Sequence, residues 1–381
     1  MSEGQKTVQF SYKTPVRIYE EKNAVRKHAD EICAFGKRAL IVTGRHSAKS
    51  CGALDDVYAA LDAGWVTSVL FDEVEENPSV ETVMRARELG VSEGCDFVIA
   101  IGGGSPMDAA KAIAIMIFHK EQSGEFLHRK GYEHAADMRR ESLPVIAVPT
   151  TCGTGSEVTA VSVLTRNDLR TKQSSPLRLF PALALVDHTY LEKAPFSLIV
   201  NTSIDAFGHL VESFINTGAT AVTEETARAG LLEWSKTKDV LLGKREASEE
   251  DLFSLMRSSN IAGQAIAQSG TSLPHALSYR LTYELHVPHG KAIGIFQPGF
   301  VRYAGAEYRR KLLDWAGFES FDAFEGFISA TVNTDDFPQD MMQSAISRSI
   351  EEVLLAPERI AKVPYQVDRS ILFSFAKCGK I

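Results

Sequence analysis

Two apolar segments of this sequence run directly into loops of small residues. Phe97 to Ile101 is followed by three glycines and Ser105, and Leu143 to Val148 is followed by Pro149 and a Thr-, Gly- and Cys-rich stretch. Short apolar runs of this kind are typical of strands buried in a parallel sheet. Small residues at the end of such a strand favour a loop that holds a polar or anionic ligand.

Strand-like and helical segments alternate over the first half of the chain. Strands are expected at 7–20, 39–44, 66–71, 97–101, 143–148 and 182–187, with helices near 23–35, 52–63, 79–89 and 104–117. This alternation predicts a parallel sheet covered by helices on both faces. From about residue 191 the pattern becomes a series of amphipathic helices, expected near 198–217, 220–238, 248–268 and 270–285. We predict an α/β domain with a Rossmann-like sheet at 1–187 and an all-α domain at 188–381.

Composition excludes several classes of protein. The 381 residues carry a net charge of −8, which argues against a nucleic-acid partner. No apolar run approaches the roughly 20 residues that span a membrane, and the polar N-terminus lacks a signal-peptide core. The five cysteines are scattered and never spaced as C-x-x-C, which argues against a disulfide framework and for a reducing cytoplasm.

The first glycine loop, Gly102-Gly103-Gly104-Ser105, is expected to open a helix. A helix N-terminus with outward N–H groups favours a phosphate, and glycines allow close approach. The loop is neither a strict G-x-G-x-x-G nor a P-loop, so a plain strand-to-helix turn is the alternative. A second loop after a neighbouring strand favours a dinucleotide site. Asp108 is included as a candidate cofactor residue, although a surface ion pair with Lys111 is the simpler reading.

Four residues in the helical half form a candidate metal site. Asp205 and His209 are four apart on an expected helix and so share a face. His275 begins another helical segment, and His289 is held between a proline and a glycine. One carboxylate and three imidazoles suit a divalent transition metal, and both Fe²⁺ and Zn²⁺ fit. On its own, a pair such as Asp205 and His209 is more often a cap or a solvent-exposed pair than a metal site.

These motifs together resemble the iron-containing (group III) alcohol dehydrogenases. The likeness rests on the glycine loop, on Pro-Thr-Thr-Cys-Gly-Thr-Gly-Ser-Glu-Val at 149–158, on Asp-Ala-Phe-Gly-His at 205–209 and on the paired histidines. It runs from about residue 8 to 300. The resemblance implies a dehydroquinate synthase-like fold, with nicotinamide and metal in the cleft between the two domains.

The resemblance also implies roles for particular residues. The metal ligands would be Asp205, His209, His275 and His289, with iron favoured over zinc. The pyrophosphate would lie on Gly102, Gly103, Gly104 and Ser105. The rest of the cofactor would be lined by Thr150, Thr151, Thr154, Ser156, Asn77 and Lys172. Family members also suggest a homodimer or higher homo-oligomer, with residues 7–20 as a candidate contact.

Two departures from the family pattern affect function. Tyr279 stands where many members carry a histidine proposed as a proton relay, and its ordinary pKa of about 10 makes it a poor relay at neutral pH. It is retained as a candidate catalytic residue. At the second departure, Gly44 replaces an aspartate that would bond the ribose of NAD(H), and Arg45, Ser47 and Lys49 follow. A missing carboxylate beside new cations favours NADP(H) over NAD(H). The alternative is that Arg45 and Lys49 point to solvent and Gly44 only makes the turn.

We therefore predict a metal-dependent oxidoreductase that moves a hydride reversibly between a small alcohol or aldehyde and NADP(H). Three alternatives stay open: a hydroxyacid–oxoacid transhydrogenase with retained cofactor, a dehydroquinate synthase-like lyase, and a non-catalytic protein. The aromatic side chains of Phe207, Tyr279 and Tyr283 are candidate pocket walls. The sequence shows no charged anchor for an acid, and Cys152 is expected to be a small filler beside the glycines.

Overall fold

The computed structural model describes residues 14–129, 137–169 and 171–378 of the chain. Much of the strand predicted at 7–20 lies outside the described residues. Its last part forms strand β1 (Arg17–Glu20), at one edge of the sheet.

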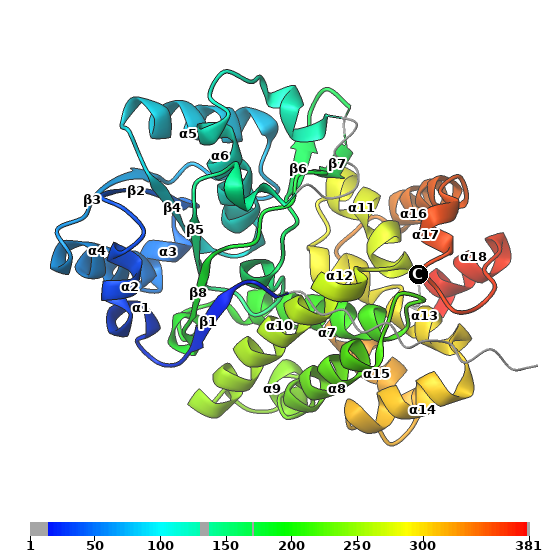
Figure 1. The fold of residues 1–381 in the computed structure, drawn as a ribbon. Helices are drawn as coiled ribbons and strands as arrows, with labels where there is room; N and C mark the ends of the chain where they lie inside the picture. Colours follow the sequence, from blue (N-terminus) through cyan, green and yellow to red (C-terminus); the bar gives the residue numbers. More distant parts are fainter. Residues whose placement is uncertain (1–13, 130–136, 170, 379–381) are drawn as a thin grey trace, which may run out of the picture.

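A six-stranded parallel sheet forms the N-terminal half of the molecule (Figure 1). Its strand order is β1-β8-β5-β4-β2-β3. The strands after β1 are β2 (Arg38–Thr43), β3 (Thr67–Phe71), β4 (Phe97–Gly102), β5 (Val145–Pro149) and β8 (Leu183–Val186). Gly102 is in register with Pro149, so the two small-residue loops leave the sheet side by side at its carboxyl edge. The predicted parallel sheet is confirmed.

Helices cover both faces of this sheet because its buried strands alternate their apolar side chains. Leu40 and Val42 pack toward one helical layer, whereas Ala39 and Ile41 pack toward the other. The first layer holds α5 (Val80–Ser92) and α6 (Gly104–Phe118). The second holds α1 (Ala24–Lys27), α2 (Ala29–Cys33), α3 (Ser47–Ser50) and α4 (Ala53–Ala63).

The C-terminal half is helical, as the sequence predicts. Its largest core is built around Trp234, Phe207, Phe214 and Phe300, and it reaches Ala184 of the sheet. Its helices are α7 (Phe196–Phe214), α8 (Ala221–Ser235), α9 (Lys238–Leu241), α10 (Glu249–Ser269), α11 (Leu273–Leu285), α12 (His289–Gly294), α13 (Gln297–Tyr303), α14 (Ala306–Trp315), α15 (Phe321–Thr331), α16 (Gln339–Leu354), α17 (Pro357–Ile360) and α18 (Arg369–Cys378). Within the described ranges, no helix is both long and apolar enough to cross a membrane.

The structure contains a hairpin that the sequence did not predict, and one predicted helix is divided into two. Strands β6 (Val163–Arg166) and β7 (Thr171–Ser174) form an antiparallel hairpin where no strand was predicted. The helix expected at 23–35 is divided at His28, whose ring stacks on Tyr19 at 3.5 Å between centroids. Four short 3-10 helices complete the fold: η1 (Gly124–His128), η2 (Met138–Arg140), η3 (Ser156–Val158) and η4 (His188–Leu191).

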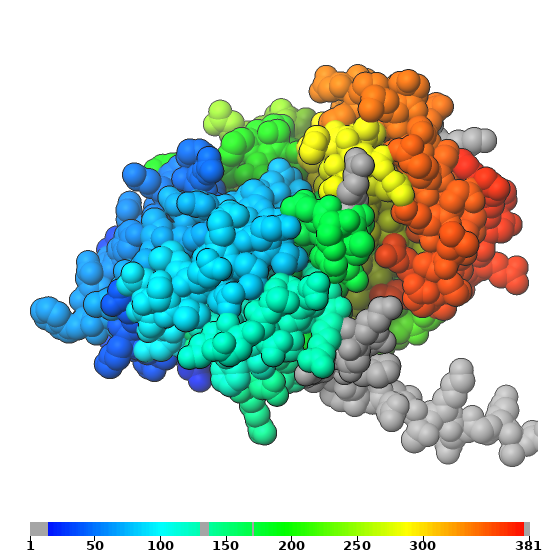
Figure 2. Space-filling view, turned by 90° about the horizontal axis from the view of Figure 1, so that it is seen from above, coloured from blue at the N-terminus to red at the C-terminus, as the bar shows by residue number. Residues whose placement is uncertain are grey.

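The two halves lie side by side, with the hairpin at their border. Figure 2 shows blue and cyan N-terminal segments on one side, orange and red C-terminal segments on the other, and green segments between them. Strand β7 contacts α11, so the hairpin reaches from the sheet domain to the helical domain. The helical domain is therefore held close to the carboxyl edge of the sheet, where the loops emerge.

Lys111 of α6 is a fully buried cation that supports the second loop. Its ammonium donates to Ser156 Oγ at 2.6 Å and to Val161 O at 2.9 Å, and it lies 3.4 Å from Asp108 Oδ1. The expected surface ion pair with Asp108 is wrong, because the Lys111 side chain is 0% exposed. A buried ammonium must keep all of these partners, since desolvation is otherwise unfavourable.

We predict that Lys111→Met destabilises the protein by about 3 kcal/mol, because Asp108 and Ser156 would lose a buried charged partner. The control is Lys236→Met, which also breaks an i,i+3 ion pair but at a lysine that is 58% exposed. That change should cost less than about 1 kcal/mol. Urea unfolding measures both, and equal losses in the two variants would contradict the role given to Lys111.

Candidate active site

Three helices bring the four predicted metal ligands together. Asp205 and His209 lie on α7, His275 on the first turn of α11, and His289 at the start of α12. Ligand atoms of Asp205, His275 and His289 all lie within 4.8 Å of one another. His209 completes the cluster, with its Nε2 3.6 Å from Asp205 Oδ1 and its ring stacked on His275 at 4.6 Å.

The cluster has the chemistry of a divalent metal site. Asp205 Oδ1, His275 Nε2 and His289 Nδ1 are buried without a hydrogen-bond partner among the described residues. Buried polar atoms without partners are costly, and a cation would satisfy the carboxylate oxygen and imidazole nitrogen that face each other. These residues therefore fit the metal that the sequence predicts.

Charge and burial set the protonation of these ligands. Burial lowers the pKa of His289 to about 3 and also lowers that of His209, against the pull of Asp205. Both rings are thus neutral, the form that binds a metal. Burial would raise the pKa of Asp205, but the surrounding imidazoles outweigh it and keep this carboxylate ionised. For His275, burial is outweighed by Glu212 and Asp205, which raise its pKa to about 9.

Glu212 was not predicted from sequence, yet it holds His275 in place. Its carboxylate accepts from His275 Nδ1 at 2.7 Å, from the Ser272 N–H at 2.7 Å and from Gln297 Nε2 at 2.9 Å. It therefore caps the N-terminus of α11 and also fixes the histidine tautomer, which leaves Nε2 free to face Asp205. Glu212 is fully buried and lies three residues after His209, a spacing that shares one helix face.

The second small-residue loop, Thr150 to Ser156 after β5, is called the threonine loop below, and it contacts the cluster of predicted metal ligands. His209 Nδ1 lies 3.2 Å from Gly153 O, so this nitrogen is the donor and Nε2 turns toward Asp205. Gly153 permits the approach, because a Cβ there would lie 2.6 Å from Thr202 O of α7. The loop that follows β5 and the helix that carries two metal ligands are thereby in contact.

The two small-residue loops also pack on each other. A Cβ at Gly103 would lie 3.0 Å from Thr151 Oγ1, and one at Gly104 would lie 2.9 Å from Thr154 Cγ2. No side chain caps the N-terminus of α6, which starts at Gly104. Its leading N–H groups are therefore available to an anion such as a pyrophosphate. Thr150 Oγ1 is also buried without a partner in the described chain.

Three further predicted cofactor residues form one cluster beside the first loop. The Asn77 N–H donates to Ser105 Oγ at 3.1 Å, and Lys172 donates to Asn77 Oδ1 at 2.6 Å. Burial lowers the pKa of Lys172 to about 8, with Glu76 opposing the shift. Lys172 belongs to β7, so the unpredicted hairpin is the element that delivers it.

Other predicted residues have different surroundings. The Ser156 hydroxyl donates to Asp108 Oδ1 at 2.6 Å and accepts from Lys111, so both Ser156 and Asp108 have internal partners. Their predicted contact with the cofactor now rests on the resemblance alone.

Phe207 is fully buried against Trp234 and Phe324, so it is a core residue and the expectation of a pocket wall is wrong.

The end of β2 carries the residues on which the predicted choice of cofactor rests. Gly44 follows the strand, and Arg45, Ser47 and Lys49 are exposed just beyond it.

Cys152 is fully buried, and burial raises the pKa of its thiol to about 11. A protonated buried thiol is a poor nucleophile, which agrees with the expectation of a filler.

Family models match both domains of the chain. The model described as iron-containing alcohol dehydrogenase matches residues 15–188. A second model, for the C-terminal part of the Fe-containing alcohol dehydrogenase family, matches residues 199–335. This chain belongs to the iron-containing alcohol dehydrogenase family.

Individual relatives agree with this family. The chain is 30% identical to lactaldehyde reductase of Escherichia coli over 295 residues, covering 76% of this chain and 75% of the relative. It is 32% identical to an NADPH-dependent butanol dehydrogenase of Clostridium saccharobutylicum, covering 70% and 68%. An iron-containing alcohol dehydrogenase structure from Thermotoga maritima superposes with a TM-score of 0.84 at 30% identity, over 98% of this chain and 100% of that one.

A nicotinamide cofactor and an iron ion are implied by this family. The iron-containing alcohol dehydrogenases are oxidoreductases that act on alcohols and aldehydes, and this chain is an enzyme of that kind. The N-terminal α/β domain and the helical C-terminal part that the resemblance implies are confirmed by the solved iron-containing alcohol dehydrogenases.

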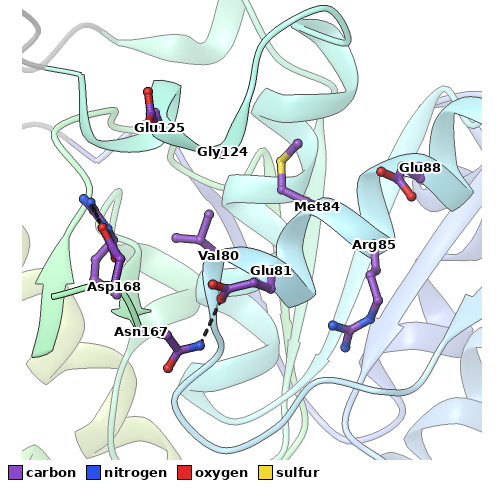
Figure 3. A pocket seen from close by; sticks show the side chains of 10 residues that line it. Val80, Glu81, Met84, Arg85, Glu88, Gly124, Glu125, Asn167 and Asp168 are labelled. Atoms are coloured by element: carbon purple, nitrogen blue, oxygen red, sulfur yellow. Dashed lines mark hydrogen bonds and ion pairs between the residues drawn. The ribbon is translucent and has the colours of Figure 1, made fainter. Parts of the chain in front are cut away.

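A separate groove of about 420 Å³ lies away from this site, between α5, η1 and the hairpin (Figure 3). Its walls carry both acidic and basic side chains, and Asn167 bridges it by donating to Glu81 at 3.0 Å. None of the predicted metal or cofactor residues lines it. The groove therefore has no part in the site described above.

We predict that Glu212→Gln weakens metal binding by about 10- to 100-fold, because an amide orients the His275 ring less firmly than a carboxylate. Chelator competition with the metal-depleted protein measures this dissociation constant without any activity assay. Glu307→Gln, at an exposed carboxylate of α14, is the control and should leave the constant unchanged. Unchanged metal affinity in a folded Glu212→Gln protein would refute this role.

Proposed function

We propose that this enzyme transfers a hydride reversibly between a small alcohol or aldehyde and NADP(H), with Fe²⁺ as the favoured metal. The observation that carries the proposal is the contact between His209 of the metal cluster and Gly153 of the threonine loop. This contact supports the proposal, because hydride transfer next to a Lewis acid requires the metal ligands and the dinucleotide-binding loop to lie close together.

When bound, the metal supplies polarisation of the substrate oxygen, and the nicotinamide supplies or accepts the hydride. The chain's own residues do the positioning. Asp205, His209, His275 and His289 would hold the metal, and Glu212 would keep His275 in the required tautomer. Glycines 102 to 104 and the uncapped start of α6 would hold the pyrophosphate. Fixed positions on both sides of the reacting atoms lower the entropic cost of reaction.

Tyr279 is proposed as a wall and hydrogen-bond donor, with no proton transfer of its own. It lies one helical turn after His275 on α11. Burial raises the pKa of its hydroxyl above the usual range, and Arg359 opposes that shift. A phenol with a raised pKa stays protonated at neutral pH, so it donates a hydrogen bond more readily than it relays a proton.

The NADP(H) preference is supported by the end of β2. Arg45 and Lys49 are exposed and form no ion pair within the described residues, and Gly44 offers no carboxylate to repel a 2′-phosphate. One relative is an NADPH-dependent butanol dehydrogenase. A solved relative at 26% identity, a sulfoacetaldehyde reductase from Bifidobacterium kashiwanohense, was crystallised with NAD⁺, so family membership alone does not decide the cofactor.

We also propose a homo-oligomer in a reducing cytoplasm. Edge strand β1 pairs with β8 on one side only within the described sheet, which leaves backbone groups available to a second copy. Cys33, Cys51, Cys95 and Cys152 are free thiols, in keeping with a reducing compartment. The transhydrogenase alternative would use the same site. Turnover without added nicotinamide would distinguish it from the proposed dehydrogenase.

We predict that His275→Ala loses metal and activity together while the fold is retained. The wild-type protein loaded with Fe²⁺ or Zn²⁺ should oxidise NADPH in the presence of small aldehydes. Metal analysis, circular dichroism and the NADPH assay would be run on both proteins. Full activity in a metal-free His275→Ala protein would rule out the proposed metal site.

We predict that Gly44→Asp shifts the cofactor preference toward NAD(H) by about tenfold or more, because the new carboxylate repels a 2′-phosphate and accepts from a ribose hydroxyl. A Cβ at Gly44 would lie 3.3 Å from the backbone oxygen of Val74, so the backbone must shift by a few tenths of an ångström, and circular dichroism checks that the variant is folded. Titration of the wild type and the variant with NADPH and NADH measures the ratio. A wild type that binds NADH more tightly than NADPH would reject the proposal.

A further inference from the structure

Two cations lie beside the metal-bearing helix α11, and a third, from the sheet domain, acts on one of them through its charge. They are Arg178, in the segment after the hairpin, Arg359 of α17 and Lys362, just after α17. The sequence shows no anchor for an acid, because Arg178 lies about 180 positions before Arg359 and Lys362 along the chain. The contact between α17 and α11 brings Arg359 and Lys362 to this helix.

Arg359 and Lys362 both lie beside α11. The guanidinium of Arg359 lies 5.8 Å from the ring centroid of Tyr279, one turn from the metal ligand His275. The ammonium of Lys362 donates to Thr271 O at 3.2 Å, directly before Ser272 at the helix N-terminus. Glu212 binds both Ser272 and His275, so Lys362 lies at the same helix end as the metal cluster.

Arg178 approaches from the sheet domain. Its neighbour Leu179 donates to Ala160 O at 3.0 Å, so this segment runs beside the chain that leaves the threonine loop. Burial lowers the pKa of Lys362; Glu212 opposes this shift, and the charges of Arg359 and Arg178 add to it. Arg178 also contributes to the lowered pKa of Lys111, which lies under the threonine loop.

Within the described part of the chain these three cations form no ion pair, whereas arginines elsewhere around α11 do. None of the three forms a salt bridge with a described carboxylate, and Arg178 Nη1 is buried with no hydrogen-bond partner. On the outer side of α11, in contrast, Arg280 pairs with Glu284 and Glu352, and Arg348 pairs with Glu284. Partly buried positive charges without counter-charges are unfavourable in a free protein, and an anionic ligand would compensate them.

We propose that Arg178, Arg359 and Lys362 bind the anionic group of an aldehyde substrate whose carbonyl is presented to the metal site. The inference rests on the proposed function and adds the substrate class, a small aldehyde that carries a carboxylate, sulfonate or phosphonate. Guanidinium groups bind such oxyanions by paired, charge-assisted hydrogen bonds. The location beside Tyr279 and His275 argues for substrate rather than cofactor phosphate, since the two glycine-containing loops already provide for the latter.

The test compares neutral and anionic aldehydes with the metal-loaded enzyme and NADPH. Propanal and butanal are the neutral probes, and glyoxylate, succinic semialdehyde, sulfoacetaldehyde and phosphonoacetaldehyde are anionic probes of different length and head group. The wild type should show a kcat/KM at least about tenfold higher for one anionic probe than for the neutral ones, the ratio expected of one charge-assisted contact. This preference should fall as salt concentration rises.

Variants assign the preference to the cations. Arg359→Gln and Lys362→Met should each lower kcat/KM for the anionic probe by about tenfold or more, mainly through KM. Turnover of propanal, metal content and the dissociation constant for NADPH should stay within about twofold. Arg310→Gln removes an exposed charge on α14 and is the matched control, which should change none of these.

The outcomes separate the two proposals. Turnover of neutral aldehydes with no preference for any anionic probe overturns the substrate class and leaves the proposed function standing. The same holds if the variants weaken NADPH binding and affect all aldehydes equally, because the cations would then serve the cofactor. A metal-loaded enzyme that turns over none of the probes overturns both.

Discussion

The contact between His209 and Gly153 is the interaction on which the rest of the site depends. One imidazole nitrogen bonds a loop carbonyl, which turns the other nitrogen toward Asp205. Loop and metal cluster therefore define each other's geometry. The loop belongs to the sheet domain and the histidine to the helical domain, so the same bond also joins the two domains at the proposed site. Enzymes gain much of their rate from such fixed relative positions.

Buried charge supports this arrangement from both sides. On the sheet side, Lys111 and Asp108 enclose the Ser156 hydroxyl and hold the end of the threonine loop. On the helical side, Glu212 joins the start of α11 to the ring of His275. Lys111, Asp108 and Glu212 have a structural role in this account. Their hydrogen bonds replace those of solvent around groups that must keep their positions, so a polar site stays ordered inside a largely apolar fold.

Much of this could be predicted from the sequence. Apolar runs that end in glycine or proline gave the parallel strands, and the four-residue spacing of Asp205 and His209 gave one face of a metal site. The hairpin was missed because its short strands, such as Thr171–Ser174, are polar and partly exposed. Lys111 was placed on the surface because local spacing carries no information about what packs against a helix. Glu212, Arg178, Arg359 and Lys362 depend on long-range contacts that no local pattern records.

A contact between two glycines gives the fold a further property. Gly155 of the threonine loop has a positive φ of 58°, and a Cβ there would lie 2.4 Å from the Cα of Gly263 in α10. The reverse also holds, since a Cβ at Gly263 would lie 2.7 Å from Gly155 Cα. Backbone meets backbone at this point, with no side chain to adjust. In protein engineering, the threonine loop and helix α10 would therefore have to be exchanged together, although about a hundred residues separate them in the sequence.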